Sequence, residues 1–133
     1  MINQLKIILT FVFMLVLLFG QQNTVKINKK KIEIGKTDIL FKVKGMVCSF
    51  CAQGLQKNLS KLSYIDKKNY TKGVKVSLKD QITIISTKEG AKIDYDLAVK
   101  KIVDAGYNVE KAYHNPTGLK VEQVSLNASK QND

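Results

Sequence analysis

The pattern that decides the fold lies in residues 38–62, which read DILFKVKGMVCSFCAQGLQKNLSKL. Ile39, Phe41 and Val43 alternate with their neighbours, which is the period of a half-buried strand. Gly45 breaks this period, and apolar residues then recur at intervals of three and four, which predicts a helix over roughly residues 50–62. The stretch is therefore a strand and a helix, with both cysteines of the chain where the connecting loop meets the helix.

The remaining elements follow in an order that defines a fold class. Residues 63–72 show no period and predict a loop, and two short alternating runs within residues 74–85 predict a hairpin. Asp94 is a favourable cap for a second helix, which Gly106 ends, and residues 107–113 are enriched in strand formers. The order strand, helix, strand, strand, helix, strand predicts an α+β, ferredoxin-like βαββαβ fold. In this fold two helices cover one face of a four-stranded antiparallel sheet.

The segments outside this core divide the chain into four parts. Residues 1–20 include a short apolar run that matches an export signal and falls below the ~20 residues of a membrane-crossing helix. A cleaved signal, a short membrane anchor and a buried helix of the domain remain open. We expect residues 21–37 to be a linker that can donate a short edge strand, 38–113 to be the folded domain, and 114–133 to be a loosely ordered polar tail.

The location of the chain follows from the first two of these alternatives. Both place the domain outside the cytoplasmic membrane, in a periplasmic or other extracytoplasmic compartment, with membrane contact through the N-terminal segment alone. Such compartments are oxidising, so a free pair of cysteines there must be kept reduced or kept occupied.

The charge of the chain bears on its partners. The net charge is +11 and is carried by lysine alone. Lysine lacks the planar fork with which arginine reads phosphates and bases, so we expect no nucleic-acid partner. A solvated basic surface that biases which partners approach is the simpler interpretation.

The two cysteines fall at a chemically distinctive place. Cys48 lies in the loop after the first strand, and Cys51 lies at the opening of the first helix. Unpaired N–H groups at a helix N-terminus favour thiolate over thiol and lower a cysteine pKa. Two convergent thiolates suit a soft monovalent ion such as Cu(I), whereas structural zinc would need four ligands.

Other uses of the two cysteines stay open at this point. A buried inert pair is one, and a redox couple with the C-x-x-C spacing is another, although the strand order differs from that of thioredoxin. A cysteine nucleophile would need a base, and His114 is the single histidine. We expect His114 to be a surface residue and not a ligand, Met46 to pack under the loop, and Tyr107 either to pack or to shield the site.

Two segments of the chain resemble a known family. The stretch GMVCSFC, residues 45–51, resembles the G-M-x-C-x-x-C signature of heavy-metal-associated domains. These domains occur in copper chaperones, in metal-pumping ATPases and in the periplasmic mercuric-ion-binding protein. DAGYNVEKAY, residues 104–113, and VKVSLKDQITIIS, residues 74–86, look like later parts of the same domain, so the resemblance covers roughly residues 38–113.

The resemblance implies roles for individual residues. Cys48 and Cys51 match the metal ligands, Gly45 and Met46 match the loop that presents them, and Tyr107 matches an aromatic residue near the site in bacterial members.

The resemblance also has departures. The loop at residues 63–72 is longer than usual, and Val47 stands where threonine is common. Val47 and Ser49 flank the first cysteine where zinc- or cadmium-selective members often carry an acid, which favours Cu(I) first and Hg(II) next.

The functional expectation is a non-enzymatic carrier. It would bind one soft metal ion, Cu(I) or Hg(II), and pass it to a membrane metal transporter or metal-pumping ATPase by stepwise thiol exchange. A thiol-disulfide redox protein and a membrane-tethered metal sensor or adaptor remain as alternatives.

Overall fold

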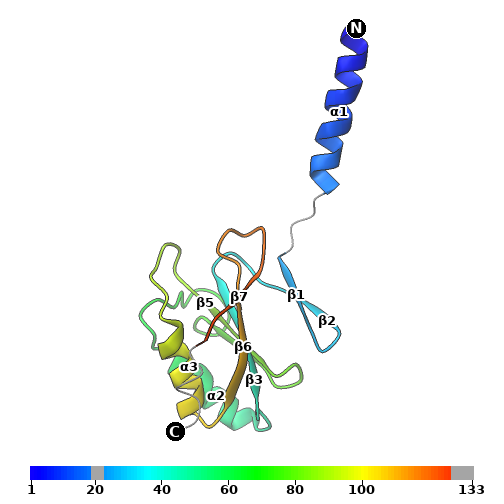
Figure 1. The fold of residues 1–133 in the computed structure, drawn as a ribbon. Helices are drawn as coiled ribbons and strands as arrows, with labels where there is room; N and C mark the ends of the chain where they lie inside the picture. Colours follow the sequence, from blue (N-terminus) through cyan, green and yellow to red (C-terminus); the bar gives the residue numbers. More distant parts are fainter. Residues whose placement is uncertain (19–22, 127–133) are drawn as a thin grey trace.

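The computed structural model describes residues 1–18 and 23–126, and Figure 1 shows how their helices and strands are arranged. The elements in chain order are α1 (Ile2–Leu18), β1 (Thr24–Ile27), β2 (Lys30–Glu33), β3 (Asp38–Lys44), α2 (Ser49–Leu59), β4 (Val74–Ser77), β5 (Ile82–Ser86), α3 (Tyr95–Asp104), β6 (Asn108–His114) and β7 (Glu122–Val124).

The main sheet has five strands in the order β4-β5-β3-β6-β7, and every neighbouring pair is antiparallel. Its first four strands and the helices α2 and α3 give the βαββαβ order, which confirms the predicted ferredoxin-like fold. β3 lies at the centre of the sheet, so the segment that follows β3 leaves the most firmly held strand of the domain.

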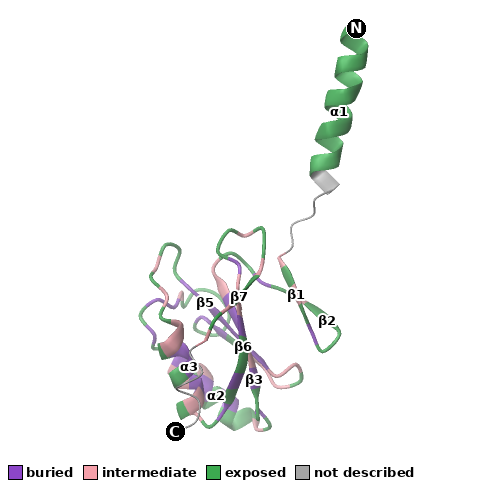
Figure 2. Cartoon of the chain, viewed as in Figure 1, coloured by how far each residue is buried: buried purple, intermediate pink, exposed green. Residues whose placement is uncertain are grey.

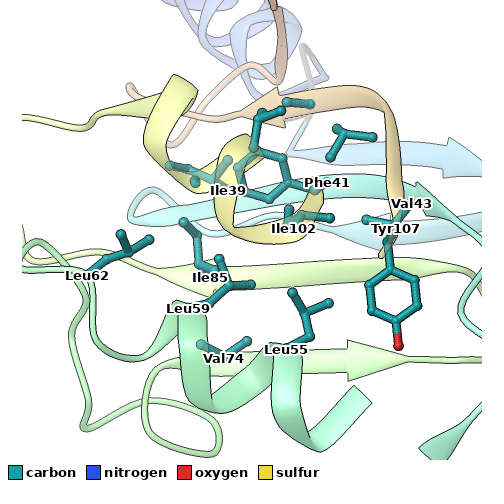
Figure 3. Packing of buried hydrophobic residues seen from close by; sticks show 14 of the residues in the cluster. Ile39, Phe41, Val43, Leu55, Leu59, Leu62, Val74, Ile85, Ile102 and Tyr107 are labelled. Carbon is teal, nitrogen blue, oxygen red and sulfur yellow. The ribbon is translucent and has the colours of Figure 1, made fainter. Parts of the chain in front are cut away.

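One face of this sheet forms the main core with α2 and α3 (Figure 3). The alternating residues Ile39, Phe41 and Val43 of β3 are fully buried there, as their period predicts. Leu55 and Leu59 of α2 pack in the same cluster, together with residues of α3 such as Ile102. Burying a large apolar side chain stabilises a fold by ~1.5–3 kcal/mol, so this cluster is the main source of stability.

The opposite face of the sheet is also covered, which differs from the expected linker at residues 21–37. β1 and β2 form an antiparallel hairpin, and Ile27 and Ile34 pack with Leu40, Ile82 and Ile84 in a second buried cluster. The turn of this hairpin has positive φ angles at both central positions, 50° and 67°, the type I′ geometry that suits the twist of two-residue hairpins.

The expected polar tail is likewise ordered over its first part. His114 still belongs to β6, and Asn115 is fully buried, where its side chain donates to the Ile34 carbonyl at 2.9 Å. β7 then pairs with β6 and adds the fifth strand. A three-residue strand lies below the length at which a period can be seen in a sequence. Residues 127–133 of the expected tail lie outside the described residues.

Residues 63–72 form a loop, as predicted, but the loop is packed against the sheet. Tyr64 and Ile65 are buried, and Ile65 forms a bridge with Thr87 next to the end of β5. The N–H of Asp66 donates to the Ser86 carbonyl at 2.8 Å. The longer loop is therefore part of the core and holds its own fixed position.

α1 contains the apolar run at the start of the chain, and the side chains described along it are exposed (Figure 2). Among the described residues, no helix combines the length and apolar character needed to cross a membrane. The end of the expected signal or anchor segment, residues 19 and 20, lies outside the described residues.

Candidate metal centre

The loop between β3 and α2 begins with a backbone turn that presents the cysteines. Gly45 has a φ of +90°, a conformation that glycine adopts without the steric cost of a side chain. Met46 then points inward with 1% of its surface exposed, and its sulfur lies 3.8 Å from the Thr83 hydroxyl, which donates to it. Met46 therefore packs under the loop, as expected from the sequence.

The two cysteines lie together at the N-terminus of α2. Cys48 is the N-cap residue, with an extended backbone, and its Sγ accepts a hydrogen bond from the Cys51 N–H at 3.4 Å. Cys51 lies in the first turn and is exposed, and Cys48 is partly exposed. A sulfur atom thus occupies the position in which Ser or Asp usually caps a helix.

The two thiols have different acidities because they face each other. A hydrogen bond from the Cys51 thiol, followed by bonds from the Cys51 and Phe50 backbone, lowers the pKa of Cys48. The same thiol-thiol hydrogen bond, then burial and the negative charge on Cys48, raise the pKa of Cys51. The lower pKa of Cys48 means that Cys48 ionises before Cys51.

Tyr107 lies at the edge of the core beside this pair. Its ring is buried next to Val43 (Figure 3), and its Cδ1 is 3.9 Å from where a Cβ on Gly45 would lie. Its hydroxyl is buried without a close hydrogen-bond partner among the described residues. Burial raises the pKa of Tyr107, and the neighbouring charge of Cys51 raises it further. The ring thus closes the core side of the site.

His114 lies at the other end of the molecule. It pairs with Ile39 at the start of β3, whereas Lys44, next to the cysteine loop, pairs with Asn108. Five residue steps along β3 separate these pairs, or about 17 Å. The ring is half-buried, which corrects the expectation of a surface residue, and its Nδ1 bonds the Tyr95 hydroxyl at 2.7 Å. Burial lowers the pKa of His114.

The surroundings of the two cysteines are open and partly apolar. Among residues 1–18 and 23–126, no group of three or more His, Cys, Asp or Glu side chains is placed to hold a metal ion. The residue before each cysteine is apolar and projects into solvent, since Val47 is 90% exposed and Phe50 is 82% exposed. The thiols are thus open to an incoming ligand, with two exposed apolar side chains beside them.

Gln81 is a residue of this site that the sequence analysis did not identify. It follows the β4–β5 turn, and its side chain bonds both the N–H and the C=O of Met46. The sequence holds no local signal for this contact, because the partners are 35 residues apart and one of them is backbone.

No family model and no curated protein matches the chain. The solved structures to which it is similar include domains of copper-handling proteins.

Three of these structures show how far the similarity extends. The yeast copper transporter domain Ccc2a, solved in apo and Cu(I)-loaded states, is 22% identical, with 56% of this chain and 92% of that chain covered and a TM-score of 0.46. A copper-binding domain of the P-type ATPase HMA7 is 18% identical, with coverages of 66% and 93% and a TM-score of 0.43. The apo HMA domain of the copper chaperone for superoxide dismutase is 16% identical, with coverages of 84% and 98% and a TM-score of 0.44. The likeness is one of fold alone.

Proposed function

We propose that the chain binds one soft metal ion between Cys48 and Cys51 and passes it to a membrane metal transporter or metal-pumping ATPase. Cu(I) is the first candidate and Hg(II) the second. The observation that carries this proposal is the thiol pair itself, one sulfur at the N-cap and the other in the first turn of α2, both open to solvent, with the Cys48 sulfur accepting a hydrogen bond from the Cys51 N–H.

The chemistry of the pair suits a soft ion of low coordination number. Two thiolates bound to Cu(I) form a complex with one net negative charge, and the positive end of the α2 dipole favours a negative charge at this place. Only Cys51 must lose a proton once Cys48 is ionised, so the ion displaces one proton and joins the two sulfur atoms.

The exposure of the pair suits transfer. A thiolate of a partner can add to the bound ion before either cysteine leaves, because the described protein groups leave this face of the ion open. Val47 and Phe50 give the partner an apolar surface on which to dock beside the cysteines. The net charge of +11 favours an acidic docking surface on the partner.

Equilibrium dialysis of the reduced protein tests binding. We expect one Cu(I) or one Hg(II) per chain, and loss of binding when Cys48→Ser and Cys51→Ser are combined. His114→Asn is the matched control, since His114 is the single imidazole of the chain and lies at the far end of β6; it should keep full stoichiometry. Binding that survives in the double variant would refute the proposal.

A redox function is the second candidate, and one observation favours it. The lowered pKa of Cys48 at the helix N-terminus is also what a thiol needs to attack a disulfide. A redox protein would reduce a model disulfide faster than free dithiol does at the same concentration, whereas a metal carrier would show no such excess.

The compartment belongs to the same proposal. We propose an extracytoplasmic location, with residues 1–20 acting as an export signal or a short membrane anchor. Mass spectrometry of the chain recovered from cells decides between the two. A mature N-terminus near Gln21 identifies a cleaved signal and excludes the tethered sensor or adaptor, and an intact Met1 in the membrane fraction identifies the anchor.

A further inference from the structure

Gln81 connects the cysteine loop to the turn between β4 and β5. Its Oε1 accepts from the Met46 N–H at 3.1 Å, and its Nε2 donates to the carbonyls of Met46 and of Leu78, the latter at 2.7 Å. The Gln81 backbone carbonyl also accepts from the Val43 N–H at 2.9 Å. A single residue therefore bonds the last part of β3 and the loop that follows it.

The Gln81 side chain gives the backbone of Met46 the hydrogen bonds that a neighbouring strand would otherwise provide. β3 ends at Lys44, so Met46 has left the hydrogen-bond ladder, and a buried N–H or C=O without a partner costs about 1–3 kcal/mol. The Gln81 amide satisfies both groups of Met46 at once, in the way a neighbouring strand would. The Met46 peptide, two residues before Cys48, is thereby held in a fixed place.

The turn that carries Gln81 is itself held on two sides. The Asp80 carboxylate accepts from the Ser77 hydroxyl at 2.9 Å and pairs with Lys30 at 3.1 Å. The Asn28 side chain donates to the Asp80 carbonyl at 3.3 Å. Lys30 and Asn28 belong to the β1–β2 hairpin, so the N-terminal hairpin fixes the turn and the turn fixes the loop.

We propose that Gln81 is a positioning residue that sets the spacing of the Cys48 and Cys51 sulfur atoms by holding the Met46 peptide. This inference deepens the proposed function and rests on it. Groups that orient metal ligands typically change affinity 10- to 100-fold when removed, so we expect a loss of roughly that size.

The test compares Gln81→Asn with Gln56→Asn. Gln81 has a φ of +54°, which Asn tolerates, but the shorter side chain no longer reaches Met46. Gln56 is the matched control because its Nε2 also donates to a backbone carbonyl, that of Val74 at 2.7 Å, away from the loop. Gln81→Gly also suits the positive φ and serves if the Asn variant folds poorly.

Two measurements on the reduced protein read the effect. Hydrogen exchange of the Met46 amide should speed up in Gln81→Asn and not in Gln56→Asn, while exchange in the β3–β5 ladder stays the same in both. The affinities for Cu(I), by competition with a chromophoric chelator, and for phenylarsine oxide, which bridges two thiols, should fall about 10- to 100-fold in Gln81→Asn alone.

The outcomes separate this inference from the proposed function. Equal affinities in the two variants would overturn the role of Gln81 while leaving metal binding by the unmodified chain intact. An unmodified chain that binds neither Cu(I) nor Hg(II) would overturn the proposed function. The affinity for phenylarsine oxide would then still test whether Gln81 sets the spacing of the thiols. An affinity for phenylarsine oxide that is unchanged in Gln81→Asn would overturn the inference.

Discussion

Replacement of Gly73 by alanine should lower the free energy of unfolding of the chain more than replacement of Gly90 by alanine does. Gly73 has a φ of +83°, and a Cβ built on it would lie 2.2 Å from Cγ2 of Ile65 and 2.7 Å from the Asp66 carbonyl oxygen. Ile65 is buried, and the Asp66 N–H is bonded to β5, so neither neighbour can move freely. The left-handed backbone costs about 1–2 kcal/mol with a Cβ, and the overpacking adds about 1–3 kcal/mol.

The matched control is Gly90→Ala. Gly90 has a similar φ of +74°, but no atom lies within 4 Å of where its Cβ would be. It should lose only the backbone cost of about 1–2 kcal/mol, against about 2–5 kcal/mol for Gly73→Ala. Urea denaturation followed by circular dichroism measures both losses in free energy of unfolding. Equal losses would show that the 63–72 loop yields to the added methyl group, and the description of that loop as part of the core would be wrong.

Three further predictions concern caps, the thiols and the loop. Asp94→Ala should cost about 1 kcal/mol in urea denaturation, because the Asp94 carboxylate caps α3 by accepting from the Leu97 N–H at 2.9 Å; no loss would contradict the cap. The logarithm of the Cu(I) affinity should rise with pH, with a slope near two below both thiol pKa values and a slope near one between the lowered pKa of Cys48 and the raised pKa of Cys51. Competition titrations across pH measure the slope, and a slope of two throughout would refute the difference in acidity between the thiols. Met46→Leu should keep one Cu(I) per chain in dialysis and cost less than about 1.5 kcal/mol, because Met46 fills space and its sulfur faces Thr83; lost stoichiometry would make Met46 a ligand.

The elements that could be predicted from the sequence are those whose apolar residues repeat with the period of one buried face. The apolar residues of β3 alternate with their neighbours, as at Ile39, Phe41 and Val43, and all three are buried. The side chain of Asp94 caps the start of α3, as predicted for an aspartate at that position. The β1–β2 hairpin was missed because its strands have four residues each and lie among lysines. A signal for it was nevertheless present in the centre of the sheet. Leu40 in β3 and Ile84 in β5 are apolar on the second face, which a sheet exposed to water on that face would not favour.

In the candidate site too, the parts set by neighbouring residues could be predicted from the sequence, and the parts set by residues far apart in the sequence could not. The strand, the glycine and the helix start are local, so the positions of Cys48 and Cys51 follow from the sequence. Gln81 does not, because its partner is the backbone of Met46, and a backbone group looks the same at every position of a sequence. The acidity difference between the two thiols also needed the structure, since it depends on which sulfur accepts the hydrogen bond.

The β1–β2 hairpin limits how far the domain can travel. The folded unit already begins at Asn23, whose side chain bonds Glu33, and Leu18 at the end of α1 is five residues earlier. Five residues reach at most about 18 Å, so if α1 were kept in a membrane the folded domain would begin within that distance of the end of α1 and would stay near the membrane. A chain cleaved near Gln21 carries the same domain but searches the whole compartment. If α1 acts as the proposed anchor, a single cleavage between α1 and the hairpin would change diffusion of the domain from two dimensions to three.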